Sequence, residues 1–118
     1  TFHGSVNHND VIKYFCKSHL FIFPTNTKEG FPKVLIEAMA CGIPTIVSNL
    51  ENIFDQIISN KKDGFIINSY DSRDYLRVLS YLISDENEYK KISNNCAVKA
   101  NKVYAPQNTL ANYIDLIC

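Results

Sequence analysis

Two glutamates at the start and in the middle of an apolar segment are the residues of this chain best suited to chemistry. Glu29 lies in a polar loop directly before Gly30, and Glu37 lies in a stretch that is otherwise almost wholly apolar. Carboxylates accept hydrogen bonds from ribose and sugar hydroxyls. The pair therefore indicates a site for a ligand rich in hydroxyl groups.

The segment that carries Glu37 has the start and stop signals of a short helix over residues 32–41. Pro32 suits the first helical position, and Gly42 followed by Pro44 ends the helix. Most residues between these points are apolar, which predicts a helix that is buried on most sides. Lys33 and Glu37 are four positions apart and share a face, which points either to solvent or into a cleft.

The start of this helix is also a candidate anion site. The first N–H groups of a helix have no partner within it, and the helix dipole places partial positive charge there. Behind a loop with Gly30, the N–H groups of Lys33 and Val34 can receive a phosphate, whereas Pro32 has no N–H to donate. A phosphate between two carboxylates fits a nucleoside diphosphate sugar.

Residues 29–44 read EGFPKVLIEAMACGIP. This segment resembles the signature of retaining GT-B glycosyltransferases of the group 1 type, also called family 4. Their mark is two glutamates separated by seven residues, followed by Ala-Met-Ala-Cys-Gly-x-Pro. The resemblance extends to residues 2–6, 20–24, 62–67 and 104–117, so it covers nearly the whole chain.

The resemblance implies a role for each of several residues. Glu37 would bind the ribose hydroxyls of the nucleotide. Glu29 would act as the catalytic residue beside the donor sugar, where it holds hydroxyls or stabilises charge during transfer. The remaining contacts with the donor would come from the backbone. The sugar and diphosphate would be bound by the backbone of Gly30, Phe31, Lys33 and Val34. The base would be bound by the backbone of Val6, just after the turn at Gly4. Many members have glycine at the place of Pro32, so one backbone donor is lost here.

The order of elements predicts an α/β fold, a Rossmann-like parallel sheet flanked by helices on both faces. Ligands of such sheets bind beyond the carboxyl ends of the strands. Gly4, the loop 24–31 and Asn49 follow predicted strands, in agreement with the site. We expect strands at 19–24, 43–47 and 65–68, a turn at 60–64, and helices at 10–18, 32–41, 50–59, 71–84, 86–103 and 107–117.

The length of 118 residues predicts one domain over 1–118. By resemblance it is a nucleotide-sugar-binding domain, the C-terminal lobe of a GT-B fold that is truncated at its N-terminus. Residues 2–4 read as the end of a strand, and the acceptor-binding lobe is expected to be missing, so the chain alone should be inactive.

The resemblance implies a hexosyltransferase that moves a sugar, with retention, from a nucleotide donor to a glycan or lipid-linked acceptor. The donor would be a UDP- or GDP-sugar, and neither a cofactor nor a metal is expected. Many relatives build polysaccharides or lipid-linked glycans, which suggests a place in the cytoplasm, with peripheral contact at the inner membrane face left open.

Charge and cysteine content argue against a nucleic-acid partner and against metal or disulfide roles. Twelve basic and twelve acidic residues give a net charge of zero, so there is no electrostatic case for nucleic acid as a partner. The cysteines show no paired spacing, and we expect reduced thiols without metal or disulfide roles. They are Cys16, Cys41, Cys96 and Cys118.

Alternatives from other classes remain open at this stage. One is a sugar-nucleotide epimerase of the same two-lobed fold, and another is a non-catalytic, flavodoxin-like binding module. At the level of residues, Glu37 and Lys33 can form a mere exposed ion pair, and Glu29 can be a solvated loop acid. Nucleotide affinity that depends on Glu37 separates the transferase from the binding module.

Overall fold

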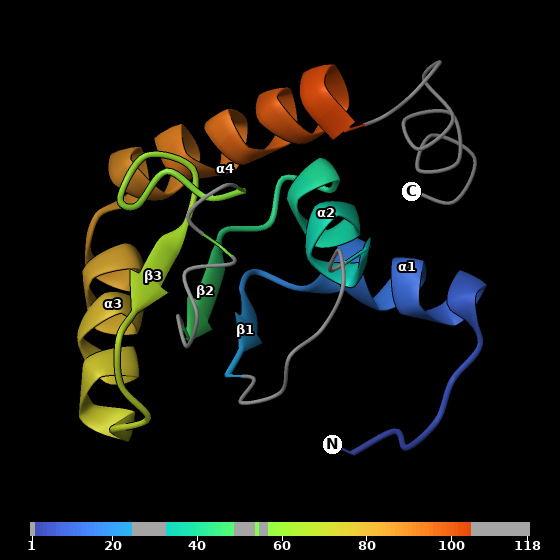
Figure 1. The fold of residues 1–118 in the computed structure, drawn as a ribbon, viewed down its shortest axis with the longest axis horizontal. Helices are drawn as coiled ribbons and strands as arrows, with labels where there is room; N and C mark the ends of the chain where they lie inside the picture. Colours follow the sequence, from blue (N-terminus) through green and yellow to red (C-terminus); the bar gives the residue numbers. More distant parts are fainter. Residues whose placement is uncertain (1, 25–32, 49–53, 55–56, 105–118) are drawn as a thin grey trace.

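Helices and strands alternate along the chain in the computed structural model, which describes residues 2–24, 33–48, 54 and 57–104. The elements in order are α1 (His8–Lys17), β1 (Phe21–Phe23), α2 (Lys33–Ala40), β2 (Thr45–Ser48), β3 (Phe65–Ile67), α3 (Ser72–Ser84) and α4 (Glu86–Lys99), which continues as a π-helical segment, η2 (Ala100–Tyr104). Figure 1 shows the strands side by side between the helices.

The three strands of the described chain form one parallel sheet in the order β1-β2-β3. Ile22 of β1 lies opposite Ile46 of β2, and Ile46 lies opposite Phe65 of β3. Parallel neighbours need a crossover connection, and α2 is the crossover between β1 and β2. The predicted class, an α/β fold with a parallel sheet flanked by helices, is confirmed.

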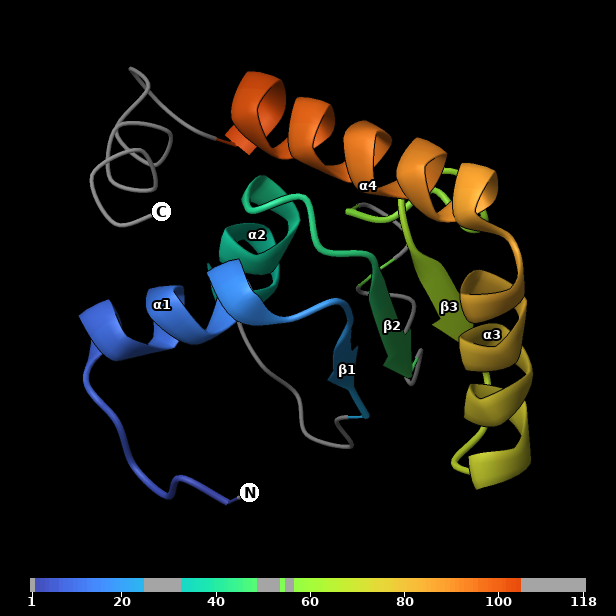
Figure 2. The ribbon, with the colours of Figure 1, turned by 180° about the vertical axis from the view of Figure 1, so that it is seen from behind.

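Successive side chains of a strand point to opposite faces, and each face of this sheet packs on different helices. On one face, Val47 joins a buried cluster with Leu35 and Met39 of α2. On the other face, Ile46 and the β3 residues Phe65 and Ile67 cluster with Leu82 of α3 and Ile92 of α4. The two views of the ribbon show α2 and α3 on opposite sides of the sheet (Figures 1 and 2).

Helix α1 lies beside α2 and extends the layer on that face. Ile12 and Phe15 are buried in one cluster with Ala38 and Ile43. Phe15 also meets the ring of Phe21 edge-on, with 5.3 Å between ring centroids. The amphipathic pattern of α1 thus fixes its position against α2 and the edge strand.

Helix α4 crosses the amino ends of the three strands (Figure 2). Its polar side chains donate hydrogen bonds to backbone carbonyls in the segments that lead into β1, β2 and β3. These bonds run from Tyr89 Oη to His19 O at 2.7 Å, from Ser93 Oγ to Gly42 O at 2.5 Å, and from Asn95 Nδ2 to Lys62 O at 2.8 Å.

Most predicted elements are present with shifted bounds. Helix α1 begins at His8 because the Asn7 side chain accepts from Asp10 N at 2.9 Å and caps the helix there. Asp71 and Asp85 likewise cap α3 and α4. The strands are shorter than predicted, and α4 ends as regular α-helix at Lys99. The predicted helices at 50–59 and 107–117 lie largely or wholly outside the described residues.

The prediction of a strand end at residues 2–4 is wrong. This segment has no strand structure, and Phe2 is fully exposed. Gly4 has φ +66°, a left-handed conformation that breaks an extended strand. Residues 2–7 form an exposed lead into α1 (Figure 1).

Candidate functional site

Helix α2 brings Glu37 into the interior of the molecule. From Leu35 to Ala40 every residue of the helix is buried, and Glu37 itself is only 4% exposed. The turn at Gly42, with φ +75°, ends the helix next to the amino end of β2. Since α2 packs along the sheet, its first residue, Lys33, lies toward the carboxyl ends of the strands, where ligands of parallel sheets bind.

The partner of Glu37 comes from another helix. His8 Nε2 of α1 lies 3.4 Å from Glu37 Oε1. Burial raises the pKa of Glu37, while the nearby His8 and Lys33 oppose this rise. The alternative of an exposed ion pair between Glu37 and Lys33 is wrong, because Glu37 is buried and its recorded ion pair is with His8.

The other predicted donor contacts are only partly described. Lys33 and Val34 form the first turn of α2, with Lys33 exposed and Val34 half-buried. Glu29, Gly30 and Phe31 lie outside the described residues, so their predicted roles stay predictions.

Gly4 and Val6 lie on the exposed segment before α1 rather than at a strand end. No hydrogen bond or ion pair of the described residues joins either one to Glu37. What connects this segment to α2 is His8, two residues after Val6. The sequence alone gives no partner for His8, because the contact arises only when α1 packs on α2.

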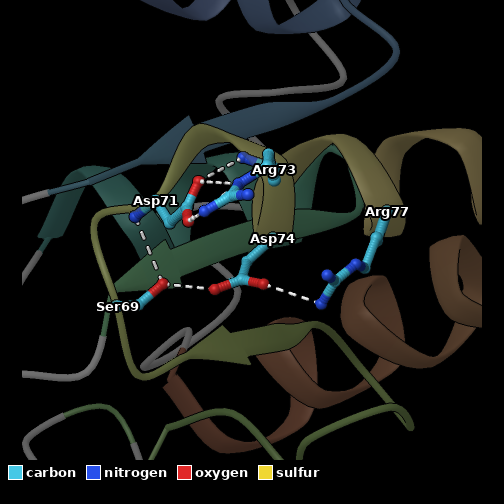
Figure 3. Close-up of polar contacts among 5 residues, drawn as sticks. All are labelled: Ser69, Asp71, Arg73, Asp74 and Arg77. Carbon is cyan, nitrogen blue, oxygen red and sulfur yellow. Dashed lines mark hydrogen bonds and ion pairs between the residues drawn. The ribbon is translucent and has the colours of Figure 1, made fainter.

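A second polar cluster lies at the connection from β3 to α3 (Figure 3). The Asp74 carboxylate accepts from Ser69 Oγ at 2.5 Å and pairs with Arg77 at 2.9 Å. The Asp71 carboxylate caps α3 by accepting from Arg73 N and also pairs with the Arg73 guanidinium. Each acid is paired with an arginine of α3, so the cluster stabilises the start of α3 and its opposite charges neutralise one another.

The predicted site residues do not line the hollow between β3, α3 and α4. That hollow has a volume of about 380 Å³, with Phe65, Val78 and Tyr81 in its wall and Lys61, Arg77 and Glu88 also lining it. Its walls are mainly apolar, and it faces away from α2. It was not predicted, since its residues come from three separate elements without a shared motif.

Within the described ranges no three His, Cys, Asp or Glu side chains gather as metal ligands. Among these same residues, no helix has the length and apolar character to cross a membrane.

Cys41 and Cys96 are free thiols, Cys41 half-buried and Cys96 buried. For Cys16 and Cys118 the expectation of reduced thiols stays a prediction. Burial raises the pKa of Cys96 to about 12, and burial together with the charge of Glu37 raises that of Cys41 to about 11. Thiols with such values are poor nucleophiles at neutral pH.

Comparison with known proteins decides the family. The family model described as "Glycosyl transferases group 1" matches residues 1–98, which include α2 and Glu37. The chain belongs to the group 1 glycosyltransferases. The predicted resemblance to this family is therefore confirmed.

Relatives of this glycosyltransferase chain include named bacterial enzymes. It is 30% identical over 99 residues to the capsular polysaccharide biosynthesis glycosyltransferase CapM of Staphylococcus aureus, covering 84% of the chain and 26% of CapM. It is 32% identical over 92 residues to the N,N'-diacetylbacillosaminyl-diphospho-undecaprenol alpha-1,3-N-acetylgalactosaminyltransferase of Campylobacter jejuni, covering 78% of the chain and 24% of that enzyme. The chain thus spans about a quarter of the length of these relatives.

A solved structure supports the fold. The C-terminal domain of a group 1 family glycosyl transferase (LpcC) from Francisella tularensis superposes with a TM-score of 0.79 at 23% identity. The match covers 90% of this chain and 53% of that domain. The glycosyltransferase chain therefore has the Rossmann-like architecture of a GT-B C-terminal lobe.

Proposed function

We propose that this chain is the donor-binding part of a retaining group 1 glycosyltransferase that takes its sugar from a nucleoside diphosphate sugar. The observation that carries the proposal is Glu37, a carboxylate kept in the buried interior of α2 within a family motif. Burying a charge is costly, so its retention inside an apolar helix calls for a ligand role. Glu37 binds the ribose hydroxyls.

The phosphates lie at the start of α2 in this proposal. The N–H groups of Lys33 and Val34 face the diphosphate, and the helix dipole favours its negative charge. Glu29, Gly30 and Phe31 meet the donor sugar, and Glu29 is the catalytic residue. Gly4 and Val6 contact the base through their backbone. No cofactor or metal takes part.

The acceptor is a growing glycan or a lipid-linked saccharide. Support comes from the relatives, whose names include capsular polysaccharide biosynthesis and transfer to undecaprenol-linked sugars. The acceptor is bound by a lobe that this chain does not supply, so catalysis requires that lobe as well. We place the reaction, of the hexosyltransferase type, in the cytoplasm at the inner membrane face.

Calorimetric titration of the chain with UDP, GDP and ADP tests the proposal. We expect saturable binding of one nucleotide and a loss of about 1–3 kcal/mol of binding free energy in Glu37→Ala, because a buried hydroxyl loses its acceptor. Ser93→Ala, at the opposite edge of the sheet, is the matched control and should bind as the parent does. No binding by any of the three nucleotides, or full binding by Glu37→Ala, contradicts the proposal.

A titration with nucleotide sugars separates the role of Glu29 from that of Glu37. We expect Glu29→Gln to lose about tenfold in affinity for the preferred UDP- or GDP-sugar, equal to about 1.4 kcal/mol, with little change for the bare nucleotide. Equal losses for both ligands would place Glu29 at the nucleotide rather than at the sugar.

A further inference from the structure

We propose that His8 is a positioning residue that holds the Glu37 carboxylate in place for the ribose of the donor. This inference rests on the proposed function and adds to it a residue from a different helix. The contact joins Nε2 of His8, the first residue of α1, to Oε1 of Glu37 in the middle of α2 over 3.4 Å.

The two partners differ sharply in exposure. The side chain of Glu37 is 5% exposed, and that of His8 is 55% exposed. A buried carboxylate needs a fixed donor, whereas a half-exposed imidazole does not need a buried acid. The contact therefore stabilises the Glu37 carboxylate more than it stabilises the His8 side chain. An ionised carboxylate offers about four lone-pair sites, so a single contact at Oε1 leaves capacity for ribose hydroxyls.

Three groups face Glu37 in the described structure. Lys33 lies one turn earlier on the same helix, and Cys41 lies one turn later with its thiol protonated. His8 differs from both in that it reaches Glu37 from α1. It can therefore orient the carboxylate relative to a second element, which residues of α2 cannot do.

The position of His8 in the chain gives this contact a further effect. The segment 2–7, with the proposed base contacts at Gly4 and Val6, leads directly into His8. The contact between His8 and Glu37 ties that segment to the proposed ribose-binding carboxylate. A nucleotide that touches both the base-binding segment and Glu37 then meets two parts of its site already held together.

Titrations with a matched pair of ligands test the inference. The probes are the nucleoside diphosphate that the chain prefers and its 2′,3′-dideoxy counterpart, which lacks the ribose hydroxyls. We expect His8→Ala to weaken binding of the ribonucleotide by about tenfold. The dideoxy nucleotide has no hydroxyls for Glu37 to bind, so it should lose no more than about threefold in His8→Ala, through the base-binding segment alone. General damage to the fold would instead weaken both ligands equally.

Two further variants complete the test. His8→Gln places an amide donor where Nε2 lies, so it should stay within about threefold of the parent. His19→Ala alters another exposed histidine, which accepts a hydrogen bond from Tyr89 through its backbone carbonyl, and should bind as the parent does.

The outcomes distinguish this inference from the proposed function. Full ribonucleotide binding by Glu37→Gln, or none by the parent chain, overturns both. Weak binding by Glu37→Gln together with parent-like binding by His8→Ala overturns the role of His8 alone. Equal losses for the ribo- and dideoxynucleotides in His8→Ala would also overturn it, since they would show a structural effect.

Discussion

Glu37 carries a cost for stability that a neutral side chain would not. Its carboxylate is buried among apolar residues of α2, and burial raises its pKa above the ordinary value of 4.5. His8 and Lys33 reduce this cost without removing it. The proposed contact with ribose gives a functional reason for a residue that weakens the fold.

The substitution Glu37→Gln should therefore stabilise the chain while weakening nucleotide binding. With a raised pKa, the native state favours the protonated acid, so the penalty is absent below the ordinary pKa of 4.5, grows as the pH rises from there toward the raised pKa, and is fully present above it. We expect a gain in unfolding free energy on the order of 1 kcal/mol near neutral pH, and less near the ordinary carboxyl value. Urea denaturation at both pH values measures it, and a pH-independent loss would contradict the argument.

The sequence predicts individual residues well where one local rule applies. Gly42 ends a helix because its backbone preference acts locally, and α2 ends at Ala40, one residue before the predicted end. The predicted start at Pro32 lies outside the described residues. The pairing of His8 with Glu37 follows no local rule, since it depends on how α1 packs against α2. Gly4 was misplaced for the same reason: a glycine marks a turn, but whether a strand precedes it depends on a neighbouring strand.

At the scale of elements, α4 forms hydrogen bonds at the amino ends of the strands, whereas the start of α2 lies toward their carboxyl ends. Helix α4 binds the segments before all three strands through Tyr89, Ser93 and Asn95. The ion pair between Lys99 and Asp63, at 3.1 Å and with little exposure of the Asp63 side chain, adds a fourth link near β3. Cys96 of α4 also packs in one cluster with Ile36 of α2, but none of these four polar links involves Glu37 or the start of α2, where the proposed ligand lies.

Loss of one such link should lower stability and leave binding unchanged. Ser93→Ala removes the donor to Gly42 O, and we expect a loss of about 1 kcal/mol in unfolding free energy. Ser80→Ala, on the exposed side of α3, is the control and should be close to neutral. Chemical denaturation measures the loss, and reduced nucleotide affinity in Ser93→Ala would contradict the separation of the two edges.

At the scale of the whole molecule, one face of the sheet is covered unevenly. Ile46 is fully buried there, whereas Ile22, its partner in register on β1, is 43% exposed. The α3 side chains Leu76 and Ile83 are also exposed, Ile83 to 74%. In the described residues no strand pairs with the outer edge of β1. Parallel sheets are normally covered on both faces, so this region is suited to contact with further protein.

Exposure of this edge should make the isolated chain self-associate as its concentration rises. An unpaired apolar edge strand is a template for association, and a lysine placed on it opposes that pairing. We therefore expect Ile22→Lys to remain monomeric at concentrations where the parent chain associates. Sedimentation velocity measures this, with Val98→Lys on α4 as a matched exposed control. Equal association of Ile22→Lys and the parent would exclude the β1 edge as the contact.

The placement of α4 across the amino ends of the strands has a consequence for how this domain can change over generations. The hydrogen bonds of α4 to the segments before the strands are gathered at one edge of the sheet. The donor site that we propose lies at the other edge, so substitutions there can alter which sugar or base it accepts without removing these bonds. Under the proposed function, the residues that hold the sheet and the residues that select the donor can therefore change independently, so the same fold can bind different donors.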